Sequence, residues 1–242
     1  MKQFPKNLFL LAMILFLQAG TGYPDTVMLR NGDRLIGDIQ NEFFIVRSPF
    51  SQLSVYRNFC KNIVMEKNRA SVGSVQTINN DIFIGSILTR DIQIILADQT
   101  LAAVSLSDLQ SLFIDTFGPS HAVTTTIFTA VNGSRFSGKL LNPEISIRNG
   151  YITAAYQVQA INRIEFDADR PDRVSLLLSA GDLINGNLLL QELTIQPDSA
   201  AQISIHPSEL RSIQFNAAKL LLKEFSSSAS SQKDSDGGGF SG

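Results

Sequence analysis

The side chains that could carry out chemistry are few in this 242-residue chain, and they stand apart from one another. The two histidines, His121 and His206, each lie next to a proline-containing turn. Neither has a cysteine, an aspartate or a second histidine at the spacing of zinc ligands. No Gly-x-Ser-x-Gly nucleophile elbow is present. We therefore expect no catalytic residue, no metal site and no cofactor, and predict that the protein is not an enzyme.

Aspartates recur at one position of a repeated motif and do not form a recognisable catalytic pair. Asp33, Asp81 and Asp182 occupy the same place in three copies of this motif. A carboxylate at such a place usually stabilises a turn by bonding to nearby backbone, which is the interpretation we favour. Two carboxylates brought together by folding would instead support glycoside hydrolysis, so a hydrolase is the least favoured alternative.

Cys60 is the only cysteine, so it cannot form a disulfide within the chain. Its neighbours Phe59, Ile63 and Val64 are apolar. This setting favours a small buried hydrophobic side chain. An intermolecular bridge or a reactive thiol is the alternative.

The motif itself occurs four times at nearly even spacing, and a fixed period marks repeated structural units. Its closing glycines are 48, 53 and 48 residues apart. The copies are NGDRLIG (31–37), NNDIFIG (79–85), NGSRFSG (132–138) and AGDLING (180–186). Short alternating apolar segments flank each copy, as expected for half-buried β-strands.

The motif residues have structural explanations. Its opening residues supply the positive φ angles of a tight hairpin turn. Its closing glycine falls within the next strand, where glycine usually marks a bulge or a sharp bend. The predicted turn and bend residues are Asn31, Gly32, Asp33, Gly37, Asp81, Gly85, Asn132, Gly133, Gly138, Gly181, Asp182 and Gly186.

The segment VMLRNGDRLIGDI, residues 27–39, resembles the small SH3-like or Sm-like β-barrel. Tandem units of the NGDxxxG type also resemble repeats of exported bacterial proteins. The resemblance implies an all-β fold of four small barrel units in tandem. The stretches 41–46 and 58–63, which correspond to the RNA-binding loops of Sm proteins, lack the polar pairing of those loops. Nucleic-acid binding is therefore not implied.

The N-terminus has the pattern of a secretory signal peptide over residues 1–22. Lys2 and Lys6 precede an uncharged apolar run, Leu8–Leu17, which is followed by small residues. Ten apolar residues are too few for a spanning helix, and we expect no transmembrane segment in the mature chain. We predict four repeats at 23–69, 70–118, 119–169 and 170–225, then a disordered tail at 226–242.

These features predict an exported protein, periplasmic or extracellular, that works by binding. The formal net charge of −2 gives no general attraction for nucleic acid. Units of about 50 residues bury little surface alone, so we expect neighbouring units to pack together. The favoured function is a scaffold that holds another envelope protein. The alternative is a module that binds cell-wall glycan.

Overall fold

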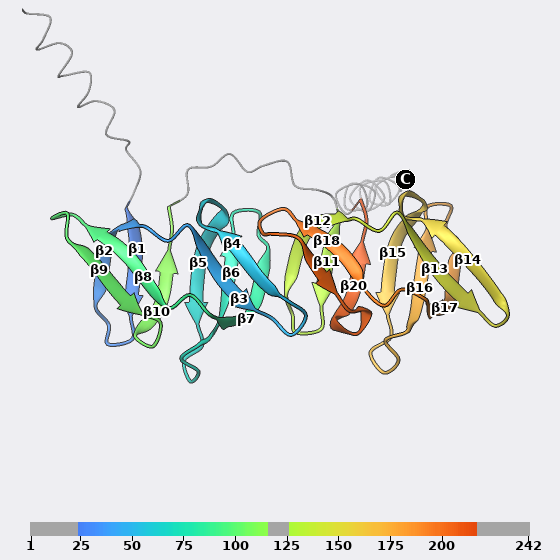
Figure 1. Cartoon of the computed structure of the whole chain (residues 1–242), viewed down its shortest axis with the longest axis horizontal. Helices are drawn as coiled ribbons and strands as arrows, with labels where there is room; N and C mark the ends of the chain where they lie inside the picture. The colour runs from blue at the N-terminus through green and yellow to red at the C-terminus, as the bar shows by residue number, and fades with distance from the viewer. Residues whose placement is uncertain (1–23, 116–125, 217–242) are drawn as a thin grey trace, which may run out of the picture.

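The computed structural model describes residues 24–115 and 126–216, and its regular structure is β-strand apart from three one-turn 3-10 helices (Figure 1). This confirms the predicted all-β class. The predicted signal peptide, His121 and the predicted tail lie outside the described residues. The strands of the first two repeats are β1 (Asp25–Leu29), β2 (Arg34–Ile39), β3 (Phe43–Arg47), β4 (Gln52–Tyr56), β5 (Cys60–Met65), β6 (Val72–Thr77), β7 (Ile82–Ile87), β8 (Asp91–Leu96), β9 (Leu101–Ser105) and β10 (Leu109–Phe113).

The third and fourth repeats have the same number of strands in the same order. These are β11 (Ile127–Ala130), β12 (Arg135–Leu140), β13 (Glu144–Asn149), β14 (Ile152–Gln157), β15 (Ile161–Phe166), β16 (Arg173–Leu178), β17 (Leu183–Leu188), β18 (Leu193–Pro197), β19 (Ile203–Ile205) and β20 (Leu210–Gln214). The 3-10 helices are η1 (Arg57–Phe59), η2 (Val158–Ala160) and η3 (Pro207–Glu209). Each of them leads into the last strand of a repeat.

Neighbouring repeats exchange their strands. The β1–β2 hairpin of the first repeat pairs with β8 of the second repeat, where Gly37 lies opposite Leu96. The β6–β7 hairpin of the second repeat pairs with β3 of the first, where Ile87 lies opposite Val46. The final strands cross over as well, because β10 pairs with β1 and β5 pairs with β6.

The third and fourth repeats exchange strands in the same way, which gives four groups of five strands. Module 1 contains β1, β2, β8, β9 and β10, and module 2 contains β3 to β7. Module 3 contains β11, β12, β18, β19 and β20, and module 4 contains β13 to β17. Each module therefore takes two strands from one repeat and three from its neighbour. The repeats expected from the sequence do not correspond one to one to these modules, because strands of the neighbouring repeat complete each module.

The modules follow one another along an elongated molecule (Figure 1). Strands β5 and β10 join modules 1 and 2, and β15 and β20 join modules 3 and 4 in the same antiparallel manner. Strands β7 and β12 meet at the centre, between modules 2 and 3. One cluster of buried apolar side chains runs through all four modules. Neighbouring modules thus share one core.

The closing glycine of each motif lies where an exchanged strand crosses. A Cβ atom on Gly85 would collide with the carbonyl oxygen of Arg47, on β3 of the other repeat. A Cβ atom on Gly138 would lie 2.6 Å from the carbonyl oxygen of Gln196, on β18. The glycines of the first and fourth motifs face β8 and β13 in the same way. Close approach of the neighbouring repeat, which the sequence did not suggest, is thus the constraint on this position.

The turn glycine has the predicted role. Gly32 has a φ of 94°, and nothing lies within 4 Å of a Cβ atom built on it. Asn80 takes this place in the second motif with a φ of 63°, a conformation that asparagine tolerates. The two glycines of the motif therefore meet different demands of the fold, one of backbone conformation and one of space.

Replacing the crossing glycine should damage the fold far more than replacing the turn glycine. We expect Gly85→Ala to lower the free energy of unfolding by about 1–3 kcal/mol or more, since β3 or β7 must move to admit the methyl group. The matched control, Gly32→Asn, introduces the residue that the second motif already has, and should change stability little. The melting temperatures of the two variants, measured by thermal unfolding, test this difference. A wild-type melting temperature for Gly85→Ala would contradict the close crossing.

Candidate functional site

The four motif turns fall into two environments. The first and fourth turns, which contain Asp33 and Asp182, are exposed at the two ends of the molecule. The second and third turns meet at the junction between modules 2 and 3, where Asp81 and Ser134 are buried. The same motif therefore makes a contact in the middle of the molecule and is uncovered at its ends.

Hydrogen bonds across the central junction are reciprocal. The backbone N–H of Ile84 in module 2 donates to Ser134 Oγ in module 3 at 2.9 Å. In return, the backbone N–H of Ser137 donates to Asp81 Oδ1 at 2.7 Å. Ser134 and Asp81 have the same place in their motifs, as do Ile84 and Ser137. The two motif strands thus face each other about an approximate two-fold axis, with Arg135 opposite Ile82.

Asp81 is the most heavily bonded side chain of this junction. Its Oδ1 also accepts from Ser137 Oγ at 2.9 Å, and its Oδ2 accepts from Ser199 Oγ at 2.7 Å. Burial raises the pKa of this carboxyl above its usual value, although the bonds from Ser199 and Ser137 act in the opposite direction. Its partners come from β12 and from the segment after β18, so this one side chain ties two strands of module 3 to module 2.

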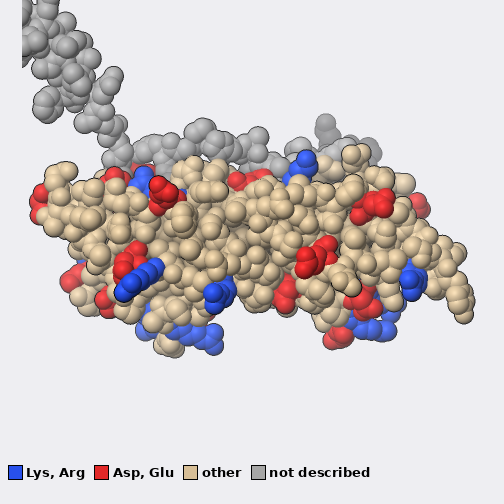
Figure 2. Space-filling view, viewed as in Figure 1, with Lys and Arg blue, Asp and Glu red and all other residues tan. Residues whose placement is uncertain are grey.

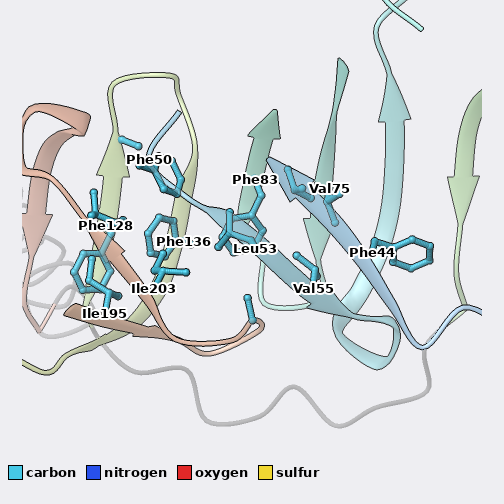
Figure 3. Packing of buried hydrophobic residues seen from close by; sticks show 14 of the residues in the cluster. Phe44, Phe50, Leu53, Val55, Val75, Phe83, Phe128, Phe136, Ile195 and Ile203 are labelled. Atoms are coloured by element: carbon cyan, nitrogen blue, oxygen red, sulfur yellow. The ribbon is translucent and has the colours of Figure 1, made fainter. Parts of the chain in front are cut away.

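Phenylalanine rings fill the apolar part of the junction (Figure 3). The ring of Phe136 stacks on Phe83 with centroids 5.4 Å apart and on Phe128 at 5.3 Å. Phe50, from the β3–β4 turn, lies 6.2 Å from the same ring and is only 9% exposed. These separations are typical of favourable aromatic pairs. Beside the rings, Val55 forms an isolated antiparallel bridge with Ala200.

The prediction that the motif aspartates hold their own turns is wrong for Asp81, whose carboxylate bonds to a different module. In the first motif the amide of Asn31 closes the turn, by accepting from the backbone N–H of Asp33 at 3.0 Å. Asn132 bonds to the backbone N–H of Ser134 in the same way. In the first and third motifs the turn role therefore belongs to the opening asparagine, which in the first motif also donates to Asp33 Oδ2 at 2.7 Å. Asn79 of the second motif makes no side-chain hydrogen bond with the described residues, and the fourth motif has Ala180 in this place.

Several residues of the junction were not singled out from the sequence. Phe83 and Phe136 stand at one motif position, where the first and fourth motifs have Leu35 and Ile184. Larger aromatic side chains in the two middle motifs alone were a usable signal that these two strands meet. Ser199 carried no such signal, because it lies in an irregular connection with no counterpart motif.

The free ends of the molecule expose apolar side chains. At the end of module 4, Tyr151 is fully exposed at the tip of the β13–β14 turn, Ile152 is 73% exposed, and Leu183 is 63% exposed. At the end of module 1, Ile36, Leu101 and Arg34 are exposed. In the face shown in Figure 2, charges of both signs are scattered, and the projecting end of module 4 is largely uncharged.

The described residues offer little else for chemistry. No three side chains of the His, Cys, Asp and Glu types gather there in a way that could hold a metal ion. Cys60 is fully buried, as predicted, and burial raises the pKa of its thiol. His206 is exposed and caps η3 by accepting from the backbone N–H of Ser208, in keeping with the expected turn role. No helix within residues 24–115 and 126–216 is long and apolar enough to cross a membrane.

The buried carboxyl of Asp81 should make stability depend on pH. Its pKa is raised above 3.8 in the folded protein, so the folded state binds a proton more readily than the unfolded state. Its stabilising effect is then fully present below pH 3.8 and is lost as the pH rises through the folded pKa. We expect Asp81→Asn to remove this pH dependence and to be tolerated best at neutral pH, because the side-chain amide can still accept from Ser137 and donate to Ser199.

Two further variants isolate this effect. Asp81→Ala leaves the N–H of Ser137 without an acceptor and should cost about 1–3 kcal/mol. Asp33→Asn, at the exposed copy of the same position, should change stability by no more than about 0.5 kcal/mol. Urea unfolding of each variant between neutral and acidic pH measures these differences. Equal pH slopes for the wild type and Asp81→Asn would contradict the buried network.

Comparisons with known proteins do not place this chain in a family. No protein-family model, no curated protein and no solved structure matches it.

Proposed function

We propose that this protein is an exported scaffold that holds another protein of the cell envelope by adding an extended segment of that partner to strand β14. A peptide that joins an exposed strand gains affinity from main-chain hydrogen bonds and specificity from alternate side chains. The single observation that carries the proposal is that strand β14, Ile152–Gln157, has one side without a partner strand among the described residues.

Strand β14 has the character of an open edge. It pairs with β13 on one side, and no strand within the described residues pairs with its other side. Among the twenty described strands it is the only one without a buried residue. Its sequence, ITAAYQ, has no charged residue and no proline, the usual protections of an exposed edge. Such an edge is suited to pairing with another chain.

The corresponding edges of the other modules are less open. In module 2, β4 forms the bridge from Val55 to Ala200. In module 3, β19 has only three residues. In module 1, β9 is uncharged but shorter than β14, and Val104 anchors it in the core. The edge of module 4 is therefore the favoured place for a partner.

The remaining parts of this proposal come from the sequence. The N-terminal pattern of two lysines, an apolar run and small residues supports export to the periplasm or the extracellular space. The motif and its flanking strands support SH3-like units as the structural type of the four modules. A scaffold function suits both, since such units present strand edges on a rigid support.

A charge on the open edge should abolish partner binding. We expect the wild-type chain to retain a partner from its own envelope fraction, and Ala155→Lys to lose it, since lysine is a natural guard of edge strands. The matched control is Ala103→Lys, at the same place on β9, which should bind normally. Amide hydrogen exchange should slow in residues 152–157 when the partner is bound. Binding that survives Ala155→Lys, or exchange unchanged in β14, would rule out this edge.

A second candidate function is the binding of cell-wall glycan, and one specific observation favours it. Phe43 and Tyr56 lie directly opposite each other on β3 and β4, and both are exposed. Two neighbouring rings form an apolar platform with a polar tip, which suits the face of a sugar.

The aromatic pair allows a direct test of this alternative. If module 2 binds glycan, the wild-type chain should sediment with purified peptidoglycan, and Tyr56→Ala should remain in the supernatant. Ala155→Lys serves as the control, because it leaves the Phe43–Tyr56 pair intact and should sediment as the wild type does. A wild-type chain that stays in the supernatant rejects glycan binding.

A further inference from the structure

The two surfaces of the central junction have counterparts at the ends of the molecule, where no other described residues cover them. Modules 1 and 3 have the same construction, and so do modules 2 and 4, because the same strands are exchanged in each pair of repeats. Superposing the first pair of repeats on the second, strand for strand, therefore places the junction face of module 2 on the free end of module 4. The same operation places the free end of module 1 on the junction face of module 3.

The free end of module 4 matches the face that module 2 uses in the length of its hairpin and in three residue positions. The β3–β4 and β13–β14 hairpins place four residues between their matching pairs, Arg47–Gln52 and Arg148–Thr153. Tyr151 therefore has the place of Phe50, the ring that packs against Phe136 across the junction. In the same way Leu183 has the place of Ile82, and Asp182 has the place of Asp81.

The free end of module 1 has the turn and backbone hydrogen-bonding groups of the face that module 3 uses, while Ile36 replaces Ser137 and so lacks its hydroxyl. Asn31 has the place of Asn132, whose Nδ2 donates to the carbonyl oxygen of Ile84 at 2.8 Å. Asp33 has the place of Ser134, so an acceptor again faces the incoming strand. The backbone N–H of Ile36 has the place of the Ser137 N–H, which bonds to Asp81.

The residue three places before the closing glycine favours contact between module 4 and module 1 over contact between two copies of module 1. This residue is Arg34, Ile82, Arg135 and Leu183 in the four motifs, so arginine alternates with an aliphatic side chain. The central junction sets Arg135 against Ile82. Module 4 against module 1 of another copy repeats this combination, with Arg34 against Leu183. Two copies of module 1 would instead bring Arg34 against Arg34, and like charges are repelled from such a contact.

We infer that copies of this chain associate head to tail, the end of module 4 on one copy against the end of module 1 on the next. Each contact is heterologous, so it leaves one free end on either copy, and further copies add in the same direction. The surface that module 4 presents to a second copy is then the exposed set of Tyr151, Leu183 and Asp182. The product is a linear assembly in which the central junction is repeated between molecules.

This inference goes beyond the proposed function and does not depend on it. The bridge from Val55 to Ala200 has no counterpart in module 1, because residues 96–100 close a tight hairpin there, with Leu96 N–H bonded to Thr100 O at 2.9 Å. The edge of β14 would therefore remain open to another protein within the assembly. Loss of partner binding and loss of self-association are separate measurements.

Two variants, each blocked at one end, test the inference by sedimentation velocity of the full-length chain. The first, Tyr151→Asp with Leu183→Asp, blocks module 4. The second, Arg34→Asp, blocks module 1 by placing a carboxylate against the aliphatic side chain of Leu183 of the next copy. We expect the wild-type mass to rise with concentration, each blocked variant to stay monomeric, and an equimolar mixture of the two to give a species of twice the monomer mass and nothing larger.

These measurements distinguish head-to-tail association from association of two like ends. Self-association of Arg34→Asp alone would mean that two copies of module 4 meet each other, which overturns the head-to-tail order. A wild-type chain that stays monomeric at every concentration overturns the inference altogether. Tyr56→Asp, which adds the same charge midway along the molecule, should associate as the wild type does. If the double variant has a lower melting temperature than the wild type, the single variant Tyr151→Asp takes its place in the experiment. The side chain of Tyr151 is fully exposed, so this substitution should not affect folding.

Discussion

The structure depends on the close crossing of two backbones at the closing glycine of each motif. At this point the exchanged strand of the neighbouring repeat runs so near that its carbonyl oxygen leaves no room for a side chain. The crossing allows the β3–β4 hairpin to leave its own repeat and complete a module with β6 and β7. Once the hairpins are exchanged, β5 and β10 must lie side by side, and two repeats become one folded unit. The continuous core follows from this connection.

Pairs of repeats are then joined by a contact of a different kind. The central junction combines stacked rings around Phe136 with a buried carboxylate, Asp81, that accepts from two serines and a backbone N–H. Burial of a charged group costs free energy, and the cost is offset only when its partners are well placed. This requirement makes the contact selective, because a module without acceptors and donors in matching places would leave Asp81 unpaired.

Much of the local structure could be predicted from the sequence, since it depends on local rules. The turn residues follow from the φ angle that Gly32 and Asn80 must adopt, and the strands follow from alternating apolar residues. The exchange could not be predicted, because β2 and β7 present nearly the same motif to an incoming strand. A strand such as Phe43–Arg47 meets glycine and apolar neighbours in either pairing. The choice between them is made by long-range packing, which a short motif does not encode.

The candidate surfaces likewise combine residues that the sequence reveals with contacts that only long-range packing creates. Asp81 was recognised as a repeated residue, but its partners lie 56 and 118 residues further along the chain. Only the pairing of β7 with β12 brings them together. The openness of β14 was likewise not visible in its sequence, because ITAAYQ is an ordinary strand sequence until one knows that one side of the strand has no partner.

The strand exchange also has a consequence for the history of the chain. A single repeat supplies two strands to one module and three to another, so a repeat gained or lost alone would leave half of a module without its complement. Changes in length should therefore occur by duplication or deletion of two repeats together. The evolutionary unit of this architecture is then about twice as long as its sequence period, and related chains of other lengths should contain two, six or another even number of motifs.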